Sequence, residues 1–111
     1  MSNLHAAIGL AQFENLDKFV KRKIEIAHLY QSAFASNRGL SWVKPLNNIR
    51  STWWLFTIVV NSKKFGISAR QLIKNLEVKR IESRPLWQPM HISRAYTGCM
   101  SLGGANAEVA F

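Results

Sequence analysis

The longest pattern in the sequence is a helical repeat of apolar residues that begins after Ser2 and continues to Ala35. Ser2 is a suitable N-cap, and Asn37 or Gly39 can end the helix in the left-handed conformation. The apolar positions recur at steps of three and four residues, which places them on one helix face: Leu4, Ile8, Ala11, Leu16, Phe19, Val20, Ile24, Ala27, Tyr30 and Phe34. We therefore predict one long N-terminal helix.

The two halves of this predicted helix differ in amphipathicity. Between Leu4 and Phe13 apolar side chains cover nearly the whole circumference, whereas from Asp17 onward a charged face leaves one apolar stripe. A helix that is apolar on all sides requires burial on all sides. Unbroken, the helix would be roughly 50 Å long, more than the roughly 35 Å diameter of a compact chain of this size, so it overhangs its domain or bends. We expect the front half to mediate self-association as a homo-oligomer, through Leu4, Ala7, Ile8, Leu10 and Ala11.

Two short strands are predicted after this helix. Leu40–Val43 is a short strand candidate, and Trp53–Val60 is a continuous β-prone run that is apolar at both parities. The second run is typical of a central strand covered on both faces. We predict that residues 61–64 form a loop.

A helix and a third strand are predicted in the next stretch. Ser68 with Gln71 three residues later is a capping box, which opens a helix to about Lys79. Its core face consists of Leu72, Ile73 and Leu76. Residues 81–84 are predicted as a third strand that ends at Pro85, and residues 92–96 as one helical turn.

This order of elements predicts an α+β fold. We expect the long helix and a small, mostly antiparallel three-stranded sheet covered by helices, with one parallel pair possible across the helix at 68–79. Residues 1–97 form one domain in this prediction. The small residues of 98–111 predict a mobile tail.

Charge and composition narrow the possible functions. The 111 residues carry 15 Lys and Arg against 6 Asp and Glu, a formal net charge of +9, which makes nucleic acid a possible partner. The basic residues are spread along the chain without a nucleic-acid motif, and their densest run, at positions 18–23, is flanked by Asp17 and Glu25. A solvated helix face is the favoured interpretation, and nucleic-acid binding remains the weaker alternative. No stretch predicts a membrane span or a signal peptide, and the single cysteine, Cys99, fits a reducing cytoplasm.

Most candidate chemistry in the sequence is weak. The three histidines and the one cysteine match no metal-site spacing, so we predict no metal. Cys99 has no acid–base partner nearby and is interpreted as a quiet thiol. Gly103 and Gly104 lack the flanking strand and helix of a phosphate-binding loop, and no nucleophile elbow occurs.

The segment from Glu82 to His91, ESRPLWQPMH, is the best candidate site. It follows the predicted third strand and contains Arg84, Trp87 and His91, which can bind an anion, stack on a ring and hydrogen-bond a hydroxyl. Loops at strand ends are common ligand sites. Composition alone favours the other interpretation, a core tryptophan with a surface arginine and histidine.

The chain resembles the C-terminal region of DegT/DnrJ-type sugar aminotransferases. The similarity lies in MSNLHAAIGLAQFENLDKFVKRKIEIAHLY, in STWWLF, in Gly66-Ile67-Ser68 and in IESRPLWQPMH, in matching order over nearly the whole chain. These are fold-type I enzymes that use pyridoxal phosphate, and RPLW-x-PMH is similar to members acting on nucleotide-linked 4-keto sugars. The resemblance implies a small-domain fold, with Ser2 and Asn3 near the cofactor phosphate and Arg84, Trp87 and His91 on the substrate side.

The resemblance also predicts what this chain lacks. The family's Schiff-base lysine belongs to a large domain that we expect upstream of Met1, and the end at Phe111 precedes the family's usual end. None of the lysines here stands in a similar setting, so we expect neither bound cofactor nor transamination by this chain alone. The leading hypothesis is an inactive small-domain fragment of an enzyme that transfers an amino group, as a rule from glutamate, to a keto sugar. The alternatives are a non-catalytic oligomerisation module derived from that domain and, more weakly, a nucleic-acid binder.

Overall fold

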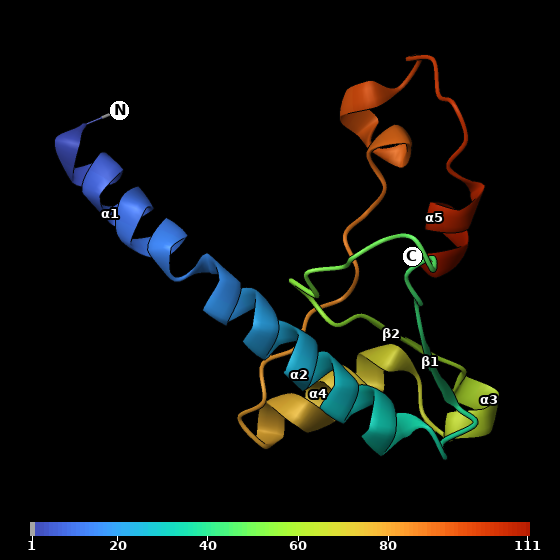
Figure 1. Cartoon of the computed structure of the whole chain (residues 1–111). Helices are drawn as coiled ribbons and strands as arrows, with labels where there is room; N and C mark the ends of the chain where they lie inside the picture. Colours follow the sequence, from blue (N-terminus) through green and yellow to red (C-terminus); the bar gives the residue numbers. More distant parts are fainter. Residues whose placement is uncertain (1) are drawn as a thin grey trace. The chain divides into compact units, whose positions relative to one another are not determined.

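The structure, a computed structural model, describes residues 2–111 and is α-rich with a small sheet (Figure 1). Its elements are α1 (Asn3–Glu14), α2 (Leu16–Phe34), β1 (Leu40–Trp42), β2 (Ile58–Val60), α3 (Ser62–Phe65), α4 (Ala69–Val78), the 3-10 turns η1 (Met90–Ile92) and η2 (Arg94–Tyr96), and α5 (Ala105–Ala110). Strands β1 and β2 pair in a two-stranded antiparallel sheet. The predicted α+β class is confirmed, and the predicted third strand is wrong.

The N-terminal helix begins where the sequence predicts but is broken once. Ser2 caps α1, its hydroxyl accepting from the backbone N–H of His5 at 3.4 Å. At Asn15 the side-chain amide donates to the carbonyl of Ala11 at 2.9 Å, while the Asn15 backbone N–H donates to Gln12 instead. A side chain thus takes the acceptor that the regular helix would use, which interrupts the ladder. Helix α2 then continues in nearly the same direction as α1 (Figure 1).

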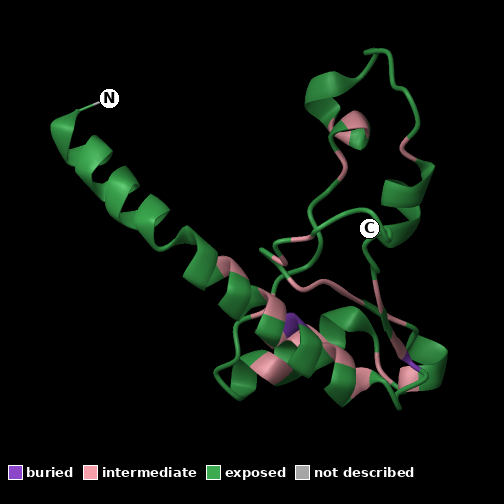
Figure 2. Cartoon of the chain, viewed as in Figure 1, coloured by how far each residue is buried: buried purple, intermediate pink, exposed green. Residues whose placement is uncertain are grey.

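Burial differs sharply between the two helices. Every residue from Ser2 to Phe19 is exposed, whereas α2 buries Ala27 and half-buries a stripe that includes Val20, Ile24 and Phe34 (Figure 2). The amphipathic back half of the predicted helix is therefore confirmed. The apolar circumference of α1 is uncovered, and its predicted partner stays a prediction.

An aromatic cluster forms around Phe56. The ring centroid of Phe56 lies 5.1 Å from that of Tyr30, 5.5 Å from Trp53, 6.2 Å from Trp42 and 6.4 Å from Phe34. Separations of this size suit offset or tilted ring packing, which adds to the gain from burying the apolar area. The cluster fixes the end of α2 against residues 53–56.

The strand predicted over 53–60 forms only at its end, as β2. Trp53 has a φ of 50°, outside the extended region, and its backbone N–H donates to the Ser51 hydroxyl at 3.2 Å. The chain turns there, and Trp53 and Phe56 enter the aromatic cluster. The expectation of a central strand covered on both faces is wrong, because only residues 58–60 pair with another strand and Trp54 and Leu55 are 64 and 56% exposed.

A short helix replaces the loop predicted at 61–64. Asn61 caps α3 by accepting from the backbone N–H of Lys64 at 3.2 Å, and Gly66 ends it with a φ of 94°. Gly39 is buried, and a Cβ there would lie 2.7 Å from backbone atoms of Phe65. A side chain at position 39 would therefore displace α3.

Helix α4 agrees with the sequence, and the segment after it does not. The Ser68 hydroxyl accepts from the Gln71 backbone N–H at 3.3 Å, and the predicted core residues of α4 are half-buried. Arg80, with a φ of 60°, ends the helix, and residues 81–89 adopt no regular structure. Residues 81–84 pair with neither β1 nor β2, so the possible parallel pair is wrong as well.

Two compact units divide the chain. One comprises the residues up to Arg38 with Trp42–Ile58, and the other comprises Gly39–Ser41 with Val59–Phe111. The helical turn predicted at 92–96 corresponds to η1 and η2 in the second unit. Residues 98–111 include α5, and their mobility stays a prediction.

Candidate functional site

Arg84 is paired with its neighbour Glu82. Its Nε and Nη2 lie 2.9 and 2.6 Å from the same Glu82 oxygen, and both side chains are more than three-quarters exposed. An exposed pair of this kind contributes little to stability. An anionic ligand could therefore take the place of Glu82 at low cost.

Trp87 and His91 lie in different surroundings. The Trp87 side chain is 66% exposed, whereas His91 is half-buried and its Nε2 lies 2.8 Å from Glu108 of α5. Neither Arg84 nor Trp87 lines the hollow beside His91. That hollow has a volume of about 310 Å³ and is lined by Met90, His91, Tyr96, Cys99, Met100, Ser101 and Leu102. The three residues predicted for the substrate side are thus not gathered into one hollow here.

Ser83 adds an unsatisfied group to the same segment. Its hydroxyl oxygen is buried without a hydrogen-bond partner among the described residues. A buried polar group without a partner costs free energy unless another molecule or segment supplies one. The sequence offered no signal for this residue or for Glu108, because both features depend on contacts distant in sequence.

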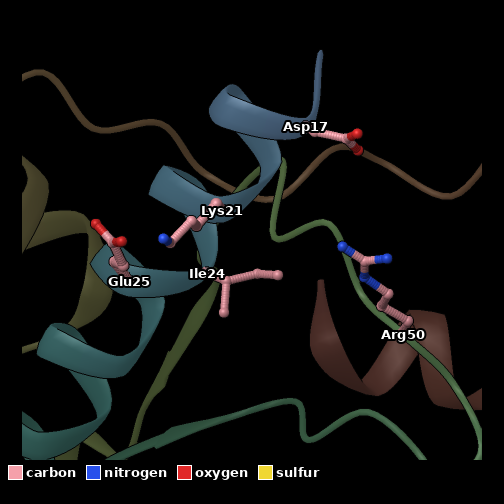
Figure 3. Close-up of a pocket in the computed structure, with 5 residues that line it drawn as sticks. All are labelled: Asp17, Lys21, Ile24, Glu25 and Arg50. Carbon is pink, nitrogen blue, oxygen red and sulfur yellow. The ribbon is translucent and has the colours of Figure 1, made fainter. Parts of the chain in front are cut away.

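A second hollow lies in the first unit. It has a volume of about 590 Å³ and is lined by Asp17, Lys21, Ile24, Glu25 and Arg50. Figure 3 shows its four charged side chains spread around the opening rather than converging on one point. Because two cationic side chains and two carboxylates line this hollow, it favours neither an anionic nor a cationic ligand.

Two side chains of the basic run of α2 have partners within the chain. Arg22 pairs with Glu25 at 3.0 Å, and Lys23 donates to the backbone carbonyl of Trp54 at 3.4 Å. This favours the interpretation as a solvated helix face. It does not test nucleic-acid binding.

Ser2 and Asn3 lie at the exposed start of α1. The Ser2 hydroxyl is also within 2.8 Å of His5 Nδ1. The first backbone N–H groups of a helix attract anions. The predicted role of these two residues at a cofactor phosphate stays a prediction.

The described residues were also considered as metal ligands and as membrane spans, and the structure offers neither. Residues 2–111 contain no group of three or more His, Cys, Asp or Glu side chains that could hold a metal. None of the helices in that range combines the length and the apolar composition needed to cross a membrane. Cys99 is a free, exposed thiol.

Comparison with known proteins decides the family. The profile of the DegT/DnrJ/EryC1/StrS aminotransferase family matches residues 1–110. The chain belongs to this family. This match confirms the resemblance noted in the sequence. It also confirms that the chain is related to aminotransferases of sugar biosynthesis.

The relatives of this DegT/DnrJ family member are longer proteins. GDP-perosamine synthase of Vibrio cholerae is 38% identical over 96 residues, which cover 86% of this chain and 26% of the relative. The enzyme of that name from Escherichia coli O157:H7 is 34% identical, covering 87% and 25%. The putative pyridoxal phosphate-dependent aminotransferase EpsN of Bacillus subtilis is 32% identical, covering 82% and 23%. The chain spans about a quarter of the length of these relatives.

The residues present do not fit a complete pyridoxal phosphate site. The cofactor needs a lysine amine for covalent attachment, close to the groups that grip its phosphate. All eight lysines are exposed. Lys18, the lysine nearest to Ser2 in sequence, lies sixteen positions away, which is about 24 Å along the helices at 1.5 Å per residue. Ser2 and Asn3, which the resemblance places near the cofactor phosphate, are therefore far along the helices from any lysine that could hold the cofactor covalently.

Proposed function

We propose that this chain serves as the small-domain part of a pyridoxal phosphate-dependent nucleotide-sugar aminotransferase and does not transaminate alone. The family match over residues 1–110, on a chain that spans 26% of the Vibrio cholerae relative, carries the proposal. The exposure of all eight lysines supports it, because a cofactor lysine is activated by its surroundings.

The proposed substrate of the complete enzyme is a nucleotide-linked keto sugar. Relatives are named GDP-perosamine synthase and, in Shigella dysenteriae, dTDP-4-amino-4,6-dideoxy-D-glucose transaminase, which is 30% identical over 90 residues. Arg84 would exchange Glu82 for a substrate anion, Trp87 would stack on a ring, and His91 would bind a hydroxyl. Glutamate is the proposed amino donor.

The exposed surface of α1 supports a second function, as an oligomerisation module. Leu4, Ile8, Leu10 and Phe13 are 70, 55, 60 and 72% exposed. Large apolar side chains gathered in this way mark interaction sites. In the complete enzyme, the cofactor domain and the second subunit of a dimer would cover them, and in this chain alone a second copy would.

A chimera tests the small-domain role. The matching 96-residue region of the Vibrio cholerae enzyme is replaced by that of this chain, and amino transfer to its keto-sugar substrate is measured. The proposal expects measurable transfer, lost on Arg84→Ala and retained in the matched control Arg70→Ala on α4. A folded chimera that carries the cofactor but transfers no amino group would contradict the small-domain role.

A further inference from the structure

The C-terminal helix α5 meets His91 through a carboxylate. His91 Nε2 and Glu108 Oε1 are 2.8 Å apart although seventeen positions separate them in sequence. The side chains are 24% and 53% exposed, so the contact lies partly shielded from solvent. Partial shielding makes such a hydrogen bond stronger than one on an open surface.

The backbone at Gly104 packs against the same ring. A Cβ at this position would lie 2.6 Å from Cε1 and 2.7 Å from Nε2 of His91, closer than real contacts allow. Gly104 also has a φ of 108°, and its carbonyl accepts from the backbone N–H of Glu108 at 3.0 Å. The Gly104 backbone thus packs beside Cε1 of the imidazole, where an added Cβ would also lie 3.2 Å from Nδ1, and the first turn of α5 brings the Glu108 carboxylate to Nε2.

We propose that Glu108 is a positioning residue that sets the tautomer of His91. A carboxylate has no proton to donate, so it accepts the proton carried by Nε2. In the neutral ring this leaves Nδ1 without a proton, as a hydrogen-bond acceptor for a ligand hydroxyl or amine. The identification of this hydroxyl as a sugar hydroxyl rests on the proposed function. The tautomer of His91 is independent of that function.

Nitrogen-resolved NMR of the imidazoles tests this on the 111-residue chain itself. At a pH where the ring is neutral, the wild-type His91 spectrum should show the Nε2-protonated tautomer as the dominant form. Glu108→Gln should raise the share of the Nδ1-protonated form several-fold, because an amide can either accept from or donate to Nε2. Glu82→Gln, which removes the carboxylate beside Arg84, should leave the spectrum unchanged.

Two glycine variants test the packing contribution. Gly104→Ala should release the ring and shift the tautomer as Glu108→Gln does. Gly103→Ala has a comparable φ of 74° with nothing within 4 Å of the added Cβ, so it should keep the wild-type spectrum. A mixed tautomer in the wild type, or no shift in either Glu108→Gln or Gly104→Ala, would overturn the proposal. An inactive chimera with this tautomer intact would count against the proposed function alone.

Discussion

Tyr30 of α2 and Phe56 lie with their ring centroids 5.1 Å apart and their planes inclined by 26°. Phe56 also approaches Phe34, Trp42 and Trp53, so one side chain connects four others. The apolar stripe of α2 ends in this cluster. The first unit is therefore organised around Phe56, and α1 lies outside the cluster.

Phe56→Ala should lower the free energy of unfolding by about 2–3 kcal/mol, because it removes the central ring of a half-buried cluster. Urea denaturation followed by tryptophan fluorescence measures the change. The control Phe111→Ala removes a ring that is 60% exposed and should change stability by less than about 0.5 kcal/mol. Equal losses in both variants would contradict this view of the first unit.

Features set by neighbouring residues could be predicted from the sequence. Ser2 and Ser68 cap helices because each hydroxyl accepts from a backbone N–H three positions later. Both partners are therefore visible in a short stretch of sequence. Asn61 and Gly66 carried a comparable signal for α3 that the loop prediction overlooked. The break at Asn15 was missed because asparagine also occurs inside helices, and only the bond from its side chain to the Ala11 carbonyl marks this position as a break.

Features that depend on distant residues could not be predicted in this way. Residues 53–57 and 81–84 have strand-forming composition, but a strand exists only where another strand offers a ladder. Trp53 and Phe56 enter the aromatic cluster, and residues 81–84 pair with neither β1 nor β2. Glu108 likewise gave no signal, because only the fold brings it to His91.

Ser83→Ala should leave the stability of the chain unchanged or raise it by up to about 1 kcal/mol, since it removes a buried hydroxyl that lacks a partner among the described residues. Ser68→Ala is the same chemical change at a cap and should instead lower stability by about 1 kcal/mol. Urea denaturation of both variants measures the difference. A loss at Ser83 as large as that at Ser68 would show that its hydroxyl is bonded after all.

Ile8→Glu combined with Leu10→Glu should convert an oligomeric wild type into a monomer, because it places two charges on the apolar circumference of α1. Light scattering coupled to size exclusion measures the mass of each protein.

Val78→Glu combined with Leu102→Glu provides the matched control, since these side chains are 86 and 91% exposed and lie outside α1. This control should keep the wild-type mass. A monomeric wild type with an ordered α1 would contradict self-association. An oligomer that survives the α1 changes would place the interface elsewhere.

Incubation of the 111-residue chain with pyridoxal phosphate, followed by borohydride reduction and peptide mapping, tests whether this chain contains a lysine that holds the cofactor. Reduction fixes any lysine-bound cofactor, so the map shows which amine reacted. We predict weak labelling that rises without saturation and is spread over several of the eight exposed lysines. Saturable labelling of a single lysine at one cofactor per chain would contradict it, because this chain would then contain the attachment site itself.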